Sequence, residues 1–238
     1  MTDYYEMNIW SRNYEDSFER QVERVYDSLL EMEKIEDLKP RYLTAMSKES
    51  AIEFELTKKN ITQLIDVKTD KKFPQLGAEI SFFTSKDDEK ICGIRFSMGK
   101  KSTRFVNSIT VNIDFLNLHN DEVKRNQIID LFNKLIKIND AFYGCIVDNA
   151  NHNLYDGYYD HSKKLPKSVF WVNYWGEEIT NRLPQQGIAV DNIEEGVYQL
   201  EQRDNGYFIR LGETSIFDDE EKIALQRKIN REIGLESS

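Results

Sequence analysis

The sequence predicts an α+β fold, with a mostly antiparallel sheet, helices packed on that sheet and a C-terminal αβ lobe. The first 147 residues show apolar patterns in the order strand, helix, three strands, helix, strand. Short connections join the three consecutive strands, which predicts an antiparallel meander. A chain of 238 residues of which 39% are hydrophobic is long enough and apolar enough to bury a substantial core.

The N-terminal part is expected to contain one strand and one long helix. Residues 4–10 alternate and are rich in aromatic and β-branched types, which indicates a strand. Asn13 is expected to cap the helix that follows. The helix carries an apolar stripe at spacings of three and four residues, formed by Phe18, Val22, Val25, Leu29 and Met32. Pro40 interrupts any continuation, and residues 52–64 are compatible with one or two short helices.

The middle of the chain contains the predicted meander, with strands over 76–84, 91–98 and 105–115. Asn120 is expected to cap the next helix, and the short apolar run 141–147 is typical of a buried strand. The apolar face of that helix is formed by Ile128, Leu131, Phe132, Leu135 and Ile138.

The C-terminal third predicts short strands, short helices and one longer helix. Residues 149–167 are polar and rich in tyrosine, which indicates a long loop with one helical turn. Residues 170–176 carry bulky groups at alternate positions on both faces, which favours a central strand over a ligand groove. Further strands are expected over 188–190, 196–202 and 207–211, and a last helix from Asp218 to Gly234. We interpret 1–238 as one domain, with possible subdomains 1–148 and 165–238.

The charge of the chain limits its partners. There are 42 acidic and 32 basic residues, which give a net charge of −10 and a pI near 5.0. Nucleic-acid binding and anionic membranes both require surplus basic residues, so neither is expected. Such a surface fits a basic protein partner, although it also simply favours solubility. We expect a reduced, cytoplasmic protein. Two cysteines are too few for a disulfide framework, the N-terminal residues do not show a secretory signal pattern, and no run of 18 apolar residues is present.

The sequence contains none of the common catalytic motifs, so we expect no enzyme, no cofactor and no metal. There is no G-x-G-x-x-G, P-loop, G-x-S-x-G, H-E-x-x-H or C-x-x-C pattern. One alternative is a small metal or acid–base site in the 148–161 loop, formed by Asp148, His152, Asp156 and His161. The other interpretation of the same residues is a hydrated loop, because Asn, Asp and Gly favour turns whatever the function.

We predict instead that this loop recognises a protein. Tyrosines are enriched at the centres of interfaces, and neighbouring carboxylates suit a basic partner. The alternative is that the tyrosines pack into the core and form hydrogen bonds there. The predicted contact residues are Asp148, Tyr155, Asp156, Tyr158, Tyr159 and Asp160, together with Asp87, Asp88 and Glu89 at the tip of the first hairpin of the meander.

Four local patterns resemble one family of binding proteins. They are Trp10-Ser11-Arg12 after the first strand, Leu165-Pro166, the run FWVNYWG at 170–176 and GVYQLE at 196–201. In this order they resemble the immunity protein 52 family and related immunity proteins of bacterial polymorphic-toxin and type VI secretion systems. The resemblance implies an α+β protein without enzymatic activity that binds and neutralises a cognate secreted toxin in the cytoplasm.

Toxins of that kind are often nucleases of the restriction-endonuclease type, so the resemblance implies a basic partner whose active site is occluded. It provides no motif-matched contact residues, and the contact residues above come from the sequence pattern alone. The alternatives are the small metal-dependent or acid–base enzyme and an accessory binding protein of a phage or defence system.

Overall fold

The computed structural model describes residues 4–43, 51–86, 92–102, 105–183, 197–203, 205–215 and 219–235. The chain divides into two compact units. The N-terminal unit comprises Met7–Ala141, and the C-terminal unit comprises Met1–Glu6 together with Phe142–Ser238. The first boundary lies within the first strand, β1 (Tyr4–Ser11), so the beginning of the chain belongs to the C-terminal unit. The segment 149–167 is part of the C-terminal unit and does not link the two.

The N-terminal unit contains the predicted antiparallel meander. Strands β4 (Ala78–Phe83), β5 (Gly93–Met98) and β6 (Asn107–Asp114) pair in sequence order. The register places Phe96 between Ile80 and Ile109, and all three side chains are buried. The short strands β2 (Tyr42–Leu43) and β3 (Ile52–Glu53) extend the sheet beyond β4. The alternating pattern therefore predicted the meander correctly, whereas β2 and β3 were not predicted and Ile52, expected on a short helix, begins β3.

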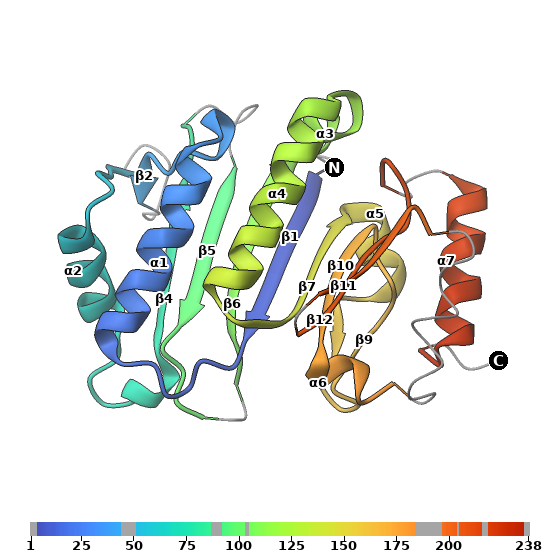
Figure 1. Cartoon of the computed structure of the whole chain (residues 1–238). Coiled ribbons are helices and arrows are strands. Elements are labelled where there is room, and N and C mark those ends of the chain that lie inside the picture. Colours follow the sequence, from blue (N-terminus) through green and yellow to red (C-terminus); the bar gives the residue numbers. More distant parts are fainter. Residues whose placement is uncertain are drawn as a thin grey trace. The chain divides into compact units, whose positions relative to one another are not determined.

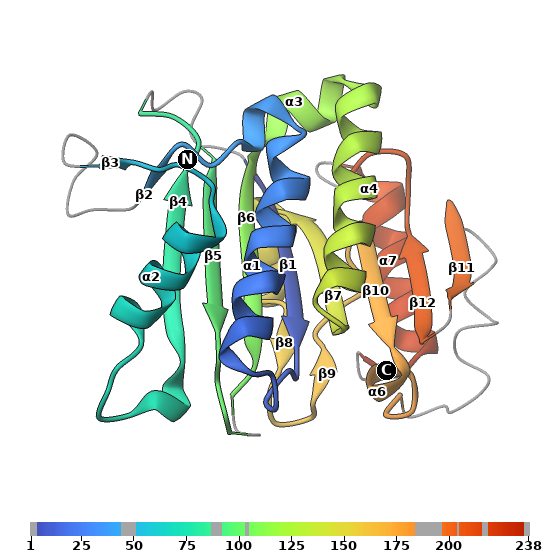
Figure 2. The ribbon, with the colours of Figure 1, turned by 60° about the vertical axis from the view of Figure 1, so that its left-hand side comes forward.

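Two long helices cover one face of these strands. Helices α1 (Phe18–Glu33) and α4 (Glu122–Ile138) lie side by side in both ribbon views (Figures 1 and 2). Most of the predicted apolar stripes of both helices are buried, but Phe18 is 38% exposed at the start of α1. The other helical elements of this unit are η1 (Glu36–Leu38), α2 (Lys58–Lys68), η2 (Pro74–Leu76) and α3 (Phe115–Asn120).

The predicted caps of both long helices are wrong. Ser17 caps α1, because its side chain accepts a hydrogen bond from the backbone N–H of Arg20. The side chain of Asn13 instead donates to the carbonyl of Asn139, 126 residues away. Likewise, Asp121 caps α4 through the N–H of Lys124, whereas Asn120 ends α3.

The sheet of the C-terminal unit has the predicted central strand. Strand β10 (Val172–Gly176) lies between β7 (Ala141–Asp148) and β12 (Gly206–Arg210), and it is antiparallel to both. Strand β11 (Gln199–Arg203) pairs with the other side of β12. All residues of β10 and of the preceding Phe170-Trp171 pair are buried, which confirms that the aromatic run is core and not a groove.

The remaining elements of this unit pack around those strands. They are α5 (Asn149–Tyr155), β8 (Tyr159–Asp160), β9 (Leu165–Pro166), α6 (Glu177–Thr180) and α7 (Glu220–Glu232). Asp219 caps α7 by accepting from the N–H of Lys222. The expected strand at 188–190 and the expected helix start at Asp218 lie outside the described residues, as does Asp204, which lies between the expected strands 196–202 and 207–211.

Candidate functional site

The tyrosine-rich segment 148–167 is more ordered than the predicted loop. Asp148 caps α5, because its Oδ1 accepts from the N–H of Asn151 over 2.8 Å. The helix ends at Asp156, whose left-handed backbone (φ 50°) reverses the chain. Strands β8 and β9 then form a two-stranded hairpin. Asp148 is only 1% exposed, so its role in this structure is to cap a helix.

The tyrosines of the segment pack inward. The ring of Tyr158 stacks on His152 with centroids 4.3 Å apart, and its hydroxyl lies close enough to Glu6 to be influenced by the charge of that carboxylate. Burial, with the nearby charge of Glu6, raises the pKa of the Tyr158 hydroxyl far above its ordinary range. Tyr159 packs against Tyr143, and Tyr155 contacts Phe170 edge-on. All three tyrosines are half-buried, and their rings pack against neighbouring aromatic side chains.

Two predicted contact residues of the segment remain accessible. The Asp156 carboxylate is fully exposed, and Lys167 lies 3.5 Å from its Oδ2. Asp160 is held by its own turn, because its Oδ1 accepts from the N–H and hydroxyl of Ser162 and from the N–H of Lys163. These hydrogen bonds, that of the Ser162 hydroxyl foremost, lower the pKa of Asp160, so its charge persists into moderately acidic solution.

A cavity of about 210 Å³ lies beside this hairpin, and we call it the hairpin cavity. A water molecule occupies about 30 Å³ of liquid, so the space equals about seven waters. Its walls come from the end of α5, the β8–β9 hairpin and the residues after α7, and all belong to the C-terminal unit. The lining residues are Tyr155, Asp160, Lys163, Leu165, Pro166, Lys167, Gly234 and Leu235.

Of these lining residues, only Tyr155 and Asp160 are among the contact residues predicted from the sequence. The others could not be found from local patterns, because Gly234 and Leu235 follow a helix that begins 54 residues after the end of the hairpin, at Glu220 against Pro166. Asp87, Asp88 and Glu89, the other predicted contact residues, lie outside the described residues.

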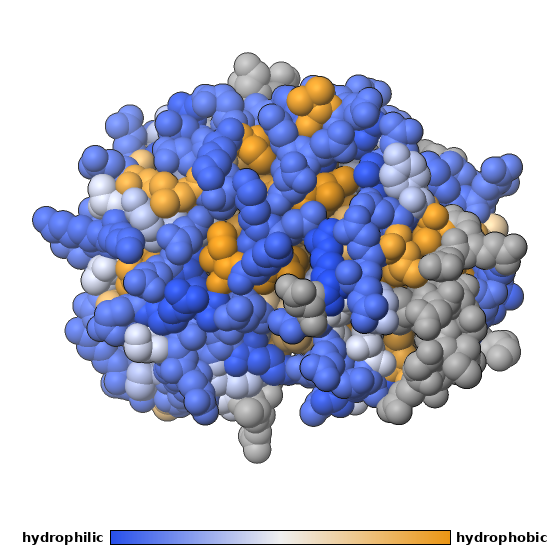
Figure 3. Space-filling view, viewed as in Figure 1, coloured by the Kyte–Doolittle hydropathy of each residue, from blue (hydrophilic) through white to orange (hydrophobic). Residues whose placement is uncertain are grey.

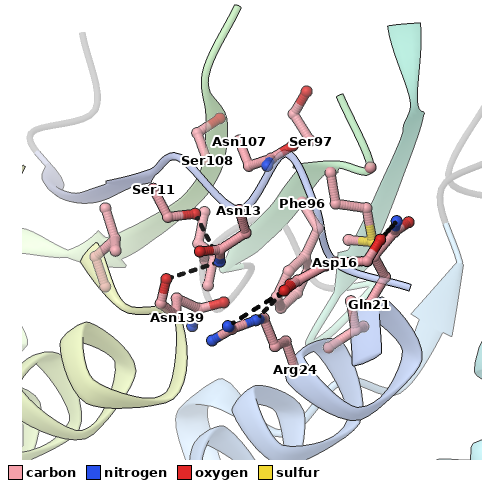
Figure 4. A pocket seen from close by; sticks show the side chains of 15 residues that line it. Ser11, Asn13, Asp16, Gln21, Arg24, Phe96, Ser97, Asn107, Ser108 and Asn139 are labelled. Atoms are coloured by element: carbon pink, nitrogen blue, oxygen red, sulfur yellow. Dashed lines mark hydrogen bonds and ion pairs between the residues drawn. The ribbon is translucent and has the colours of Figure 1, made fainter. Parts of the chain in front are cut away.

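A second, much smaller cavity lies at the start of α1 in the N-terminal unit (Figure 4). Arg24 points to Asp16 here, with Nε 2.6 Å from Oδ2, and it also pairs with Asp140 at 2.6 Å. Burial alone would lower the pKa of Arg24, but its hydrogen bonds to the two carboxylates outweigh that effect and raise it. The space measures about 30 Å³, enough for a single water, so we interpret it as a packing gap above a structural ion pair.

The histidines of the segment are engaged in ring contacts. His152 stacks on Tyr158, and His161 contacts Tyr159 edge-on. Across the described ranges, which include all of 148–161, no group of three or more His, Cys, Asp or Glu side chains is arranged to hold a metal ion. The set Asp148, His152, Asp156 and His161 is therefore not assembled as the metal site that the alternative interpretation required.

The net charge is distributed unequally between the two units. The C-terminal unit contains 19 acidic and 10 basic residues, whereas the N-terminal unit contains 23 acidic and 22 basic residues. The C-terminal unit thus carries a formal charge of −9 out of the total of −10. An excess of this size on about a hundred residues attracts cationic surfaces over roughly one Debye length, about 8 Å at physiological salt.

The face of the molecule shown in Figure 3 is mostly hydrophilic. In Figure 3 the apolar side chains of this face form small separate groups. Among the residues with known placement, no helix is both long and apolar enough to cross a membrane.

Comparison with known proteins identifies a fold relative but no family. No family model matches the chain. No curated protein matches it in sequence. Among solved structures, the chain is similar to Pseudomonas aeruginosa T6SS protein PA0821, with a TM-score of 0.69. That match covers 98% of this chain and 73% of the other at 11% sequence identity. At that identity the likeness is one of fold.

Proposed function

We propose that this chain is an immunity protein that binds and neutralises a cognate toxin of a type VI secretion system. The observation that carries the proposal is the similarity in fold, over nearly the whole chain, to a T6SS protein of Pseudomonas aeruginosa. The resemblance of the Trp10-Ser11-Arg12 and 170–176 patterns to immunity proteins supports the same conclusion independently of the structure.

The proposed mechanism is occlusion of the toxin's active site by a tightly bound acidic protein. The charge of −9 on the C-terminal unit makes this unit the side that a basic toxin would approach. If the toxin is a nuclease, its phosphate-binding cleft is cationic, and an acidic inhibitor competes for the surface that the nucleic acid would occupy. Electrostatic attraction of this kind raises the association rate more than it lowers the dissociation rate.

Co-expression with the product of the adjacent open reading frame tests the proposal. We expect the neighbour to arrest growth alone, the pair to grow, and the two proteins to co-purify as a stable complex. We also expect the association rate to fall about tenfold or more between roughly 50 and 500 mM salt, with a smaller change in the dissociation rate. A toxic neighbour that this chain neither binds nor neutralises would contradict the proposal.

A further inference from the structure

We propose that the hairpin cavity receives a lysine or arginine side chain of the partner protein, with the Asp160 carboxylate as its counter-charge. This inference rests on the proposed function, because the partner is the cognate toxin. It adds the place of contact on the C-terminal unit and the chemical class of the group that the toxin inserts there.

The cavity has the size and walls that a long cationic side chain requires. Its volume of about 210 Å³ exceeds the about 30 Å³ of the gap beside Arg24, so it has room for a whole side chain. Leu165 and Pro166 are buried and provide an apolar wall, and the contact between Tyr155 and Phe170 fixes the neighbouring ring. Lys and Arg side chains bury their aliphatic stems against such walls while the charged end reaches a polar group.

Asp160 is preorganised to meet that charged end. Its Oδ1 already accepts three hydrogen bonds, from the Ser162 hydroxyl at 2.6 Å, the Ser162 N–H at 2.9 Å and the Lys163 N–H at 3.2 Å. Its Oδ2 is 3.8 Å from Lys163 Nζ, which is a loose contact. An incoming ammonium or guanidinium group therefore finds a fixed carboxylate whose second oxygen is weakly engaged, and the carboxylate loses little freedom on binding.

The two lysines of the lining are compatible with this assignment. Lys167 Nζ donates to the backbone carbonyl of Asp156 and lies 3.5 Å from its carboxylate, so its charge is locally matched. The Lys163 side chain is 68% exposed and turns to solvent at little cost. The incoming cation would replace Lys163 at Oδ2. Lys163 thus competes with the inserted group for Asp160. Removal of the Lys163 charge should therefore tighten the complex if the inserted group is a cation and weaken it if that group is an anion.

The end of α7 adds to the preference for a cation. Gly234, with φ of 76°, ends this 13-residue helix, and Gly234 and Leu235 line the cavity. The C-terminal end of a helix carries a partial negative charge, which favours cations nearby. The excess of nine negative charges on the same unit acts in the same direction at longer range.

The first experiment measures the dissociation constant of the purified complex between variants of this chain and the toxin encoded by its neighbour. Asp160→Asn keeps the Oδ1 acceptor of the turn and removes only the charge, and we expect it to weaken the complex about tenfold or more. Lys163→Ala removes the competitor, and we expect it to tighten the complex about two- to fivefold. Asp130→Asn, at an exposed position of α4, changes the net charge equally and should alter the dissociation constant less than about twofold.

Three results would overturn the proposal. If Lys163→Ala weakens the complex and Asp160→Asn tightens it, the occupant is a carboxylate. If neither has an effect but Leu235→Trp, which fills the cavity without changing charge, abolishes binding, the occupant is apolar. If none of these variants differs from wild type, the cavity lies outside the interface. A thermal melt of each variant verifies that it is folded.

A second experiment needs no toxin and separates this inference from the proposed function. The free protein is titrated with N-acetyl-triarginine amide and, in parallel, with N-acetyl-triglutamate amide, while backbone NMR shifts are recorded. We expect saturable shifts confined to residues 155–167 and 234–235 with triarginine, and their loss in Asp160→Asn. If this pattern holds and the neighbour does not bind, the proposed function fails and the cavity chemistry stands. Equal shifts with both peptides, or shifts that survive Asp160→Asn, would overturn the cavity assignment even if the toxin binds.

Discussion

Asn151 and Gln226 bind each other through a reciprocal pair of side-chain hydrogen bonds. The Asn151 amide donates to Gln226 over 3.0 Å, and the Gln226 amide donates back over 2.9 Å. Gln226 also donates to the backbone carbonyl of Val169 at 2.6 Å. This pair joins α5 to α7 across 75 residues of sequence, and thereby fixes the two helices whose ends line the hairpin cavity.

Loss of this pair is expected to be costly, because both side chains are buried. We predict that Gln226→Leu lowers the free energy of unfolding by about 2–4 kcal/mol, since it leaves the buried Asn151 amide without its partner and removes one of the two donors to the Val169 carbonyl. The measurement is urea denaturation, with Gln202→Leu at an exposed position of β11 as the control. The double variant with Asn151→Leu should lose less than the sum of the two single losses, and additive losses would contradict the coupling.

Gly77 is predicted to tolerate no side chain. Its φ is +73°, and a Cβ atom at this position would lie 1.9 Å from the carbonyl oxygen of Met98. We expect Gly77→Ala to destabilise the protein by about 2–4 kcal/mol, because the clash is with backbone and cannot be relieved by a side-chain rotation. Gly93→Ala is the matched control in the same hairpin, since the nearest atom would be 3.7 Å away. A similar loss of stability for both variants, measured by thermal melts, would refute the steric explanation.

Arg24 is predicted to be the most important charged residue of the N-terminal unit. Its guanidinium bridges Asp16 and Asp140 and donates to the carbonyl of Ile138, while its side chain is only 11% exposed. We expect Arg24→Met to cost about 2–4 kcal/mol, because Asp16 would remain a mostly buried carboxylate without its partner. Arg20→Met breaks an exposed pair with Glu23 and should cost less than about 0.5 kcal/mol in the same chemical denaturation experiment. Equal costs would show that the burial of Arg24 is unimportant.

Stability is predicted to fall in alkaline solution. Burial raises the pKa values of Tyr143, Cys145 and Tyr158 above their ordinary values, so the folded state keeps protons that the unfolded state releases. In the unfolded chain the pKa is about 9 for cysteine and about 10 for tyrosine. The stabilisation from these three groups is fully present below those pH values and is lost as the pH rises above them. Each group should add about 1.4 kcal/mol per pH unit to the decline.

Denaturation at closely spaced pH values between about 8 and 11 measures this slope. Tyr158→Phe should reduce this slope by the contribution of one group, because phenylalanine has no proton to release. An unchanged slope in Tyr158→Phe would contradict the assignment of Tyr158 to the buried set.

The alternating and helical patterns predicted most of the fold because they depend on near neighbours. The stripe of Val22, Val25, Leu29 and Met32 is buried as a helix of 3.6 residues per turn requires. The bulky residues on both faces of 170–176 correctly indicated a strand covered on both sides. Capping residues were predicted less well, because several polar residues near a helix start compete for the same role and a distant partner decides between them. Helix α1 begins at Phe18, so Ser17 occupies the cap position, and Asn13, four residues earlier, instead donates to the carbonyl of Asn139.

At the candidate site, composition and local pattern give the types of residue that are present, whereas packing between distant segments sets which side chains face outward. Composition alone fixed the acidic charge, and the segment 148–160 alone supplied its tyrosines and aspartates. Only the fold showed that Tyr158 turns inward to Glu6, that Asp148 caps a helix, and that Asp160 shares a cavity with Leu235. Backbone periodicity depends on residues three or four positions apart, whereas burial and cavities depend on contacts between segments that are far apart in the chain.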